Sequence, residues 1–225
     1  MGRLIAIEGI DGSGKGTQSQ RLHRRLQETG IRSALLSFPR YDATFFGEAI
    51  GRFLNGEFGS LETVHPFLAS LLFAGDRFES RTMLLDSLES HEIVVLDRYV
   101  ASNVAHQAAK EKGAARDRLR LAIERIEYEV FQMPRPDRTI LLDLDVPRAQ
   151  ELIGRKARRS YTERAADIQE ADGGYLADVR QLYLELASGD SRWSIVRCDA
   201  GGAIRSEEDI ATEVGSILDA LESSR

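Results

Sequence analysis

A glycine-rich segment near the start of the chain has the residue types and the spacing that bind phosphate. It has a glycine, four further residues and then Gly-Lys, and it consists of Gly9, Ile10, Asp11, Gly12, Ser13, Gly14, Lys15, Gly16, Thr17 and Gln18. Glycines let successive backbone N–H groups curl around phosphate oxygens, and Lys15 can reach the bridging and terminal phosphates. A glycine-rich turn with an incidental lysine is the alternative. Because an apolar strand pattern precedes the segment and a helical pattern follows it, we expect a phosphate-binding loop.

The residue after the lysine departs from the usual pattern. A serine or threonine normally stands there, and its hydroxyl binds magnesium. Here that position is Gly16, and Thr17 comes one residue later. We therefore expect a magnesium ion to be held more by phosphates and waters than by a hydroxyl of the loop.

Two further groups of chemically useful residues follow apolar runs. Asp97 and Arg98 come directly after one run, where an acid can orient magnesium through water and an arginine can neutralise charge during phosphoryl transfer. Phe38-Pro39-Arg40 follows another run, and Pro39 stiffens the turn so that Arg40 can bind a second phosphate. The alternatives are a surface ion pair for the first group and a solvated loop arginine for the second.

Phe73 and Arg77 lie in a helical stretch and are four residues apart, so they share a helix face. An aromatic ring beside a guanidinium can stack on a base and bind its carbonyl. The spacing alone favours the simpler alternative, in which Phe73 belongs to the hydrophobic core.

An arginine-rich segment occurs near residue 154. Arg155, Lys156, Arg158 and Arg159 are all positive, and they lie between two helical patterns. In a lid over residues 154–166, such arginines would close on phosphates during transfer. The alternative is a solvated helix face.

The elements that position these residues alternate along the chain. Runs with strand character are 4–8, 33–38, 93–96, 139–144 and 193–196, and helical patterns cover 17–28, 45–54, 61–90, 116–132, 147–156, 167–186 and 207–221. Strands that are apolar on both faces and separated by helices indicate a parallel sheet covered on both sides. The expected fold is therefore α/β, a parallel sheet of about five strands as in P-loop nucleoside triphosphatases. Ligands of such sheets bind at the carboxyl ends of the strands, which is where the residues above occur.

Composition limits the function classes. The chain has 225 residues with no linker, so we expect one domain over residues 1–225. The net charge of −6 argues against a nucleic-acid-binding surface, and no apolar run is long enough for a membrane span. Cys198 is the single cysteine, which excludes an internal disulfide. We expect a cytoplasmic protein without nucleic-acid or membrane partners.

Taken together, the motifs resemble those of the thymidylate kinase family over most of the chain. The resemblance rests on residues 8–15, on Phe38-Pro39-Arg40, on Leu72-Phe73 with Arg77, on Asp97-Arg98-Tyr99, and on the acidic residues after the lid, Asp167 and Glu170. It implies transfer of the γ-phosphoryl group of ATP to dTMP, giving dTDP for dTTP synthesis. It also implies Mg²⁺ as cofactor and a homodimer.

The resemblance assigns roles to individual residues. It implies that Arg40 binds the acceptor phosphate, that Phe73 stacks on thymine and that Arg77 binds a thymine carbonyl. The remaining contacts to phosphate or thymine are implied for Ser102, Asn103, His106 and Gln107. Candidate metal contacts, direct or through water, are Asp11, Thr17, Asp97 and Glu170, and Asp11 and Glu170 are alternatively contacts to the acceptor sugar.

Two departures from the family bear on specificity and catalysis. Family members often have tyrosine or phenylalanine where His106 stands, and that ring disfavours a ribose 2′-hydroxyl. Some relatives carry an arginine at the place of Gly12 or Ser13, which this chain lacks. The chain therefore resembles the class whose catalytic arginine comes from the lid, as a group formed by Arg155, Arg158 and Arg159.

Two alternative functions stay open on the sequence. One is another nucleoside monophosphate kinase with a dUMP, AMP or CMP acceptor, because residues 12–18 also resemble the adenylate kinase loop. The other is a P-loop nucleotide-binding regulatory module with little chemistry.

Overall fold

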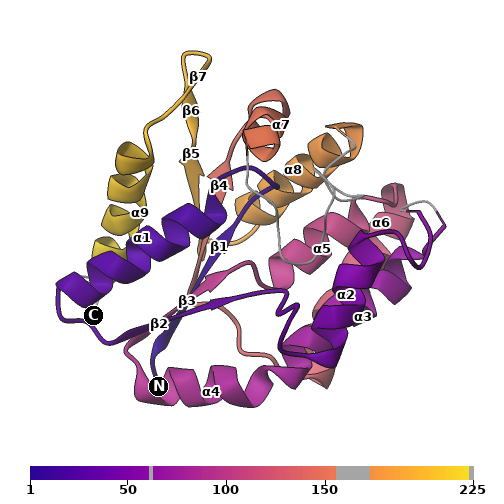
Figure 1. Cartoon of the computed structure of the whole chain (residues 1–225), viewed down its shortest axis with the longest axis horizontal. Helices are drawn as coiled ribbons and strands as arrows, with labels where there is room; N and C mark the ends of the chain where they lie inside the picture. Colours follow the sequence, from indigo (N-terminus) through magenta and orange to yellow (C-terminus); the bar gives the residue numbers. More distant parts are fainter. Residues whose placement is uncertain (61–62, 156–172, 223–225) are drawn as a thin grey trace.

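The central element of the computed structural model is a five-stranded sheet with the strand order β2-β3-β1-β4-β5 (Figure 1). All four neighbouring pairs are parallel. The strands are β1 (Arg3–Glu8), β2 (Ser33–Ser37), β3 (Ile93–Asp97), β4 (Arg138–Asp143) and β5 (Trp193–Arg197). The structure describes residues 1–60, 63–155 and 173–222. The predicted α/β fold with about five parallel strands is confirmed.

Helices cover both faces of the sheet (Figure 1). Helices α1 (Lys15–Glu28) and α9 (Glu207–Glu222) pack on one face. The other face is covered by α4 (Arg81–Ser90), α5 (Val100–Ala108) and α8 (Gly173–Ser188). Farther out lie α2 (Phe45–Leu54), α3 (Pro66–Glu79) and α6 (Gly113–Arg125), while α7 (Val146–Arg155) follows β4. Within the described ranges, no helix combines the length and apolarity that crossing a membrane requires.

Alternation along the strands explains why both faces are buried. On β1, Ile5 and Ile7 are fully buried in the cluster that includes α1 and α9, whereas Leu4 and Ala6 belong to the cluster on the side of α4 and α5. Burying an isoleucine or leucine side chain stabilises a fold by about 1.5–3 kcal/mol. A strand with apolar residues at every position therefore stabilises two helical layers at once.

The long helix expected over 61–90 is instead two helices. Chain direction changes at Ser80, which ends α3 and precedes α4. The change allows α3 to pack against α2 and α5 while α4 packs under β3. The Ser80 hydroxyl also accepts a hydrogen bond from Arg40 at 3.2 Å, so the break between the helices helps to position the arginine of Phe38-Pro39-Arg40.

Two elements were not predicted. Helix α5 lacks an amphipathic stripe because most of its residues are buried, including its polar ones. A short hairpin, β6 (Asp199–Ala200) with β7 (Ala203–Ile204), turns through Gly201 and Gly202, whose φ angles are +58° and +79°. A Gly-Gly pair is a known hairpin signal because both turn residues need positive φ.

The helix expected over 116–132 begins earlier and ends differently. It starts at Gly113 as α6, and a π-helical turn, η1 (Ile126–Val130), follows it. The wider turn carries Glu127, which is fully buried. A buried carboxylate at this place requires a partner, and the partner belongs to the candidate site.

The carboxyl ends of three adjacent strands meet at one edge of the sheet. Asp97 of β3 is level with Ile7 of β1 and with Ser37 of β2. Beyond the strands, the Phe38 N–H donates to the Asp97 carbonyl at 3.0 Å, and the Arg98 N–H donates to the Ile7 carbonyl at 3.1 Å. The glycine-rich loop after β1, Phe38-Pro39-Arg40 after β2 and Asp97-Arg98 at the end of β3 therefore lie side by side.

Candidate active site

A cavity of about 540 Å³ opens at this edge of the sheet, a size suited to a small-molecule ligand. The glycine-rich loop, the ends of β2 and β3, and helices α3 and α5 form its walls. The predicted site residues that line it are Asp11, Gly12, Gly14, Lys15, Gly16, Thr17, Phe38, Pro39, Phe73, Arg77, Asp97, Arg98, Ser102, Asn103, His106 and Gln107. The sequence did not indicate four others, which are Gln20, Ser37, Tyr41 and Leu54.

The glycine-rich loop has the geometry of an anion site. Helix α1 begins at Lys15, so its N-terminal backbone N–H groups and the positive end of its dipole face the cavity. The Lys15 ammonium lies over the loop and donates to the Ile10 carbonyl at 2.7 Å. A Cβ atom at Gly12 would be 2.3 Å from the Ala149 carbonyl oxygen, which leaves no room for a side chain there. The absence of a loop arginine at this position therefore agrees with the local packing.

The remaining predicted loop residues support the loop from outside the cavity wall. Ile10 is 2% exposed and belongs to the core. Gln18 donates from Nε2 to the Glu207 carbonyl at 3.0 Å, which ties α1 to the start of α9. Gly9 and Ser13 lie against each other, since a Cβ at Gly9 would be 2.7 Å from the Ser13 hydroxyl.

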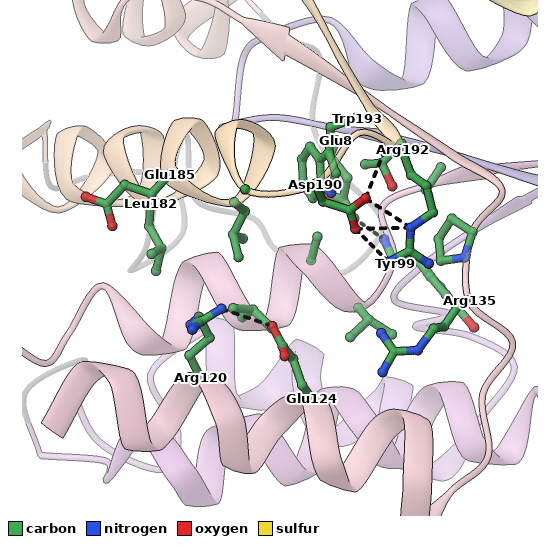
Figure 2. A pocket seen from close by; sticks show the side chains of 18 of the residues that line it. Glu8, Tyr99, Arg120, Glu124, Arg135, Leu182, Glu185, Asp190, Arg192 and Trp193 are labelled. Atoms are coloured by element: carbon green, nitrogen blue, oxygen red, sulfur yellow. Dashed lines mark hydrogen bonds and ion pairs between the residues drawn. The ribbon is translucent and has the colours of Figure 1, made fainter. Parts of the chain in front are cut away.

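A second cavity, of about 440 Å³, lies on the opposite face of α5, between α6 and α8 (Figure 2). Two of its arginines face carboxylates: Arg192 pairs with Asp190 at 2.6 Å, and Arg120 approaches Glu124 at 3.6 Å (Figure 2). The phosphate-binding loop does not line it. We therefore assign the candidate active site to the first cavity.

The buried carboxylate of Glu8 fixes the start of α5. It accepts hydrogen bonds from the backbone N–H groups of Tyr99 at 2.8 Å and Ser102 at 3.3 Å. It also accepts from the Ser102 hydroxyl at 2.6 Å and the Tyr183 hydroxyl at 3.0 Å. These contacts satisfy N–H groups that a helix N-terminus leaves without partners. The acid at the end of an otherwise apolar strand was the available sequence signal for this role.

Arg98 lies on the cavity wall, held by the side chains of Asp11, Ser102 and His106. Its guanidinium forms an ion pair with Asp11 and donates to the Ser102 hydroxyl at 3.2 Å. Its backbone has φ +66°, a left-handed conformation that is strained for a residue with a side chain. Because the Arg98 N–H donates to the Ile7 carbonyl and the Tyr99 N–H donates to the Glu8 carboxylate, the strain is retained and the side chain is directed into the cavity.

His106 is a neutral ring between Arg98 and Tyr175. The Tyr175 hydroxyl donates to the His106 carbonyl at 2.7 Å, so its oxygen can only accept from the imidazole Nδ1, 3.2 Å away. This network assigns the proton to Nδ1 and leaves Nε2 to accept from Arg98 at 3.4 Å. Burial lowers the pKa of His106 to about 3, and the charge of Arg98 lowers it too.

A buried ion pair positions Arg77. Its Nε donates to both carboxylate oxygens of Glu127, at 3.0 and 3.1 Å, and its Nη2 also bonds Glu127. The same carboxylate accepts from Asn103 Nδ2 at 2.9 Å. Breaking such a buried pair typically costs about 3–5 kcal/mol, so Glu127 is a structural requirement of the site. No local pattern in the sequence indicates this role, because the two partners are 50 residues apart.

Two amide atoms on the cavity wall have no hydrogen-bond partner among the described residues: Asn103 Oδ1 and Gln107 Nε2. Asn103 is fixed in orientation because its Nδ2 donates to Glu127 and to the Ser70 carbonyl at 3.0 Å. These two amides therefore present one buried acceptor and one buried donor to the cavity. Leaving such atoms unpaired costs about 1–3 kcal/mol each, a cost that a complementary ligand relieves.

Phe73 packs against the core and lines the cavity as well, and its stacking on a base stays a prediction. Its ring packs edge-on against Phe53, with the centroids 6.3 Å apart, and it also lines the cavity. The ring is therefore supported by the core and presented to a ligand.

Arg40 is at the border of the cavity. Its neighbours Pro39 and Tyr41 line the cavity, whereas Arg40 does not. Its backbone N–H donates to Asp76 at 3.1 Å, and Asp76 also accepts from the Thr44 hydroxyl at 2.5 Å. Burial raises the pKa of Asp76, while these two hydrogen bonds lower it. The predicted contact of Arg40 with a second phosphate stays a prediction.

Asp97 is the described residue best suited to contact a metal ion. Its Oδ1 is buried with no hydrogen-bond partner within the described ranges, and its side chain lines the cavity together with Thr17. A Cβ atom at Gly16 would be 3.2 Å from Asp97 Oδ2, so the carboxylate lies directly against the loop. Carboxylate oxygens suit Mg²⁺.

The arginine-rich segment is largely outside the described residues. Arg158, Arg159 and Glu170 belong to that part of the chain, as does most of the expected lid, 154–166. Arg155 ends α7, and only its backbone is described. Their roles stay predictions.

Comparisons with known proteins identify relatives. A family model described as thymidylate kinase matches residues 7–210. The chain is 34% identical to the thymidylate kinase of Mycobacterium tuberculosis over 198 residues, covering 87% of this chain and 92% of the relative. It is 34% identical to that of Leifsonia xyli over 219 residues, covering 97% and 95%. The solved thymidylate kinase structure from Candida albicans is similar with a TM-score of 0.71 and 25% identity, covering 100% of this chain and 94% of that one.

The buried imidazole predicts a pH dependence of stability. An unfolded histidine takes up a proton below about pH 6.5, but folded His106, with a pKa of about 3, does not. The unfolded state therefore gains stability as the pH falls from about 6.5 towards 3. At pH 5 the cost to the fold is about 2 kcal/mol. Urea unfolding of the wild type and of His106→Phe at pH 7.5 and pH 5 measures it. On acidification, the free energy of unfolding of the variant should fall by about 2 kcal/mol less than that of the wild type. Equal decreases would show that His106 is not held neutral in the folded state.

Proposed function

The chain belongs to the thymidylate kinase family, and we propose how its own residues transfer the γ-phosphoryl group of ATP to dTMP, giving dTDP. The observation that carries the proposal is a single cavity with two different ends. The glycine-rich loop and Lys15 form one end, and Phe73, Asn103 and Gln107 form the other. Arg98 lies between them. One end suits a triphosphate, and the other suits a base.

The base end is complementary to thymine. Thymine presents an N3–H donor between two carbonyl acceptors. Asn103 Oδ1 can accept from the N3–H, while Gln107 Nε2 and the Arg77 guanidinium supply donors for carbonyls. Cytosine has an acceptor at N3, which would face the fixed Asn103 oxygen without a hydrogen bond. Sites with fixed polar groups reject such mismatched ligands strongly.

Catalysis in this proposal consists of positioning and charge neutralisation. The dTMP phosphate is already anionic, so its oxygen attacks the γ-phosphorus in line without a strong general base. Lys15, Arg98 and the lid arginines, Arg155, Arg158 and Arg159, supply positive charge, while Arg40 binds the acceptor phosphate. Because Arg98 is held by Asp11 and Ser102 before any substrate binds, little reorganisation is needed during transfer.

We propose that Asp97 holds Mg²⁺, directly or through water, with Asp11, Thr17 and Glu170 as further candidates. The support is the unpartnered Oδ1 of Asp97 beside the loop. Magnesium would neutralise charge on the phosphates of ATP. Since Gly16 replaces the usual hydroxyl, phosphates and waters would complete the coordination.

The alternatives from the sequence make different demands on the cavity. An AMP or CMP kinase needs a hydrogen-bond donor that faces the acceptor nitrogen of the adenine or cytosine ring. Asn103 Oδ1 is itself an acceptor and cannot supply this bond. Uracil presents the same N3–H donor and carbonyl acceptors as thymine, so dUMP is the closest competitor of dTMP. A regulatory module does not need a residue such as Arg98, whose strained backbone directs a positive charge into the cavity where the phosphoryl group would be transferred.

We further propose that the chain works as a single domain over residues 1–225, with a lid at 154–166, in a homodimer. The support for the homodimer is exposed apolar surface on helices α3 and α6, which pack together. Leu68 is 59% exposed, Phe78 50% and Leu121 56%. Light scattering should give a mass of about twice 25.1 kDa, and a monomer at micromolar concentration would contradict the dimer.

A cytoplasmic location is proposed on composition. The single cysteine, Cys198, is buried and cannot form an internal disulfide. This suits a reducing compartment. No partner is expected beyond ATP, dTMP, magnesium and a second copy of the chain, so nucleic acid and membrane are not part of the proposal.

Loss of either fixed cation should lower turnover sharply. Lys15→Ala or Arg98→Ala removes a preorganised charge worth on the order of 3 kcal/mol, so kcat should fall at least a hundredfold while the fold is retained. Coupled-assay kinetics with thermal melting measures both effects. Arg32→Ala is the matched control, because that side chain is 71% exposed and directly precedes β2, at the opposite end of the strand from the cavity. Near-normal turnover in either variant would contradict its role.

An acceptor panel tests the substrate. With dTMP, dUMP, AMP, CMP and GMP offered alongside Mg-ATP, dTMP should be converted fastest, dUMP should be second, and the others should react at least a hundredfold more slowly. Product separation by chromatography measures the rates, and EDTA should abolish them. Hydrolysis of ATP without an acceptor should be slow. Faster conversion of AMP or CMP, or rapid acceptor-free hydrolysis, would point to the alternatives.

A further inference from the structure

Lys110 lies just beyond the end of α5 in an aromatic setting. Its ammonium is 5.4 Å from the centroid of the Phe53 ring and 6.0 Å from that of Tyr175. Cations near ring faces gain electrostatic stabilisation, which offsets part of the cost of burial. Burial lowers the pKa of Lys110 to about 8. Lys110 does not line the substrate cavity.

The ammonium has one polar contact that reaches the active site. Its Nζ donates to Gln107 Oε1 at 2.9 Å. An ammonium has donors only, so Gln107 must present its oxygen, not its NH₂ group, to Lys110. The NH₂ group of this fully buried side chain then lies on the other branch of the amide, and it has no partner among the described residues.

We propose that Lys110 is a positioning residue that sets the orientation of the Gln107 amide, so that this amide donates a hydrogen bond to a carbonyl of the acceptor base. The inference rests on the proposed function, in which the acceptor base is thymine. Without Lys110, the amide can rotate by half a turn and present its oxygen to the cavity. Two carbonyl oxygens would then face each other, and the base would lose a hydrogen bond.

The role differs from simple packing in what it changes. Support of the fold by the cation and the two rings would affect stability and turnover together. Orientation of Gln107 affects only the binding of the base, and it acts only while the amide is present. The two roles are therefore separated by KM against kcat and by coupling between the two residues.

A double-mutant cycle on Lys110 and Gln107 tests the proposal. Lys110→Met keeps an unbranched side chain of similar volume and loses the donor; it should raise KM for dTMP about threefold to tenfold and change kcat less than twofold. In the Gln107→Ala background, the same substitution should have almost no further effect. Calorimetric titration with dTMP alone should show the same loss of affinity without depending on turnover. An unchanged KM, or the full effect in the Gln107→Ala background, would overturn the proposal.

Two further variants control the test. Lys112→Met removes a lysine two residues away, whose ammonium pairs with Asp178 at 2.7 Å outside the cavity, and it should leave KM for dTMP unchanged. Lys110→Gln keeps a donor and should recover part of the lost affinity, which also covers the case in which the methionine variant fails to fold. Failure of recovery would count against orientation as the mechanism. If the wild type binds dTMP without phosphorylating it, the proposed function fails while the titrations still decide the role of Lys110.

Discussion

The site depends on one buried carboxylate. Glu8 ends the central strand directly before the phosphate-binding loop, and it accepts the backbone N–H groups that begin α5. The phosphate-binding loop and α5 therefore cannot move independently. The loop is joined to Glu8 through the backbone, and the start of α5 is bonded to the Glu8 carboxylate. Every α5 residue that faces the cavity takes its position from this connection. A strand that was apolar to its end would leave the helix start without acceptors in a dry interior, which is energetically costly.

The same connection explains how positive charge is kept ready. Arg98 follows β3 with a strained backbone, which is held because its own N–H donates to Ile7 and the Tyr99 N–H donates to Glu8. Asp11 balances its charge from the loop side, and the neutral ring of His106 accepts from it without adding positive charge. A protonated imidazole in that place would repel the guanidinium. The low pKa of His106 and the fixed position of Arg98 are therefore two results of one arrangement.

Much of this could be predicted from the sequence, and the failures have physical causes. The strands were found because they are apolar on both faces, and the motifs were found because they follow strand ends. Helix α5 was missed because burial of Asn103, His106 and Gln107 removes the amphipathic stripe that indicates a helix. The break at Ser80 and the partnership of Arg77 with Glu127 depend on contacts between distant segments, which no local pattern carries. The Gly201-Gly202 hairpin was different, because its turn signal was present in the sequence.

The π-helical turn η1 gives α6 an unusual sensitivity to length. A π turn accommodates one more residue than an α turn does, and the surplus here brings Glu127 inward to Arg77 and Asn103. Removing a single residue between 126 and 130 would convert the π turn into an α turn, which lacks the surplus residue that places Glu127 inward. The carboxylate would leave its two partners although no residue that touches substrate had changed. Insertions and deletions in this apparently peripheral helix are thus a route by which base recognition can be altered from a distance.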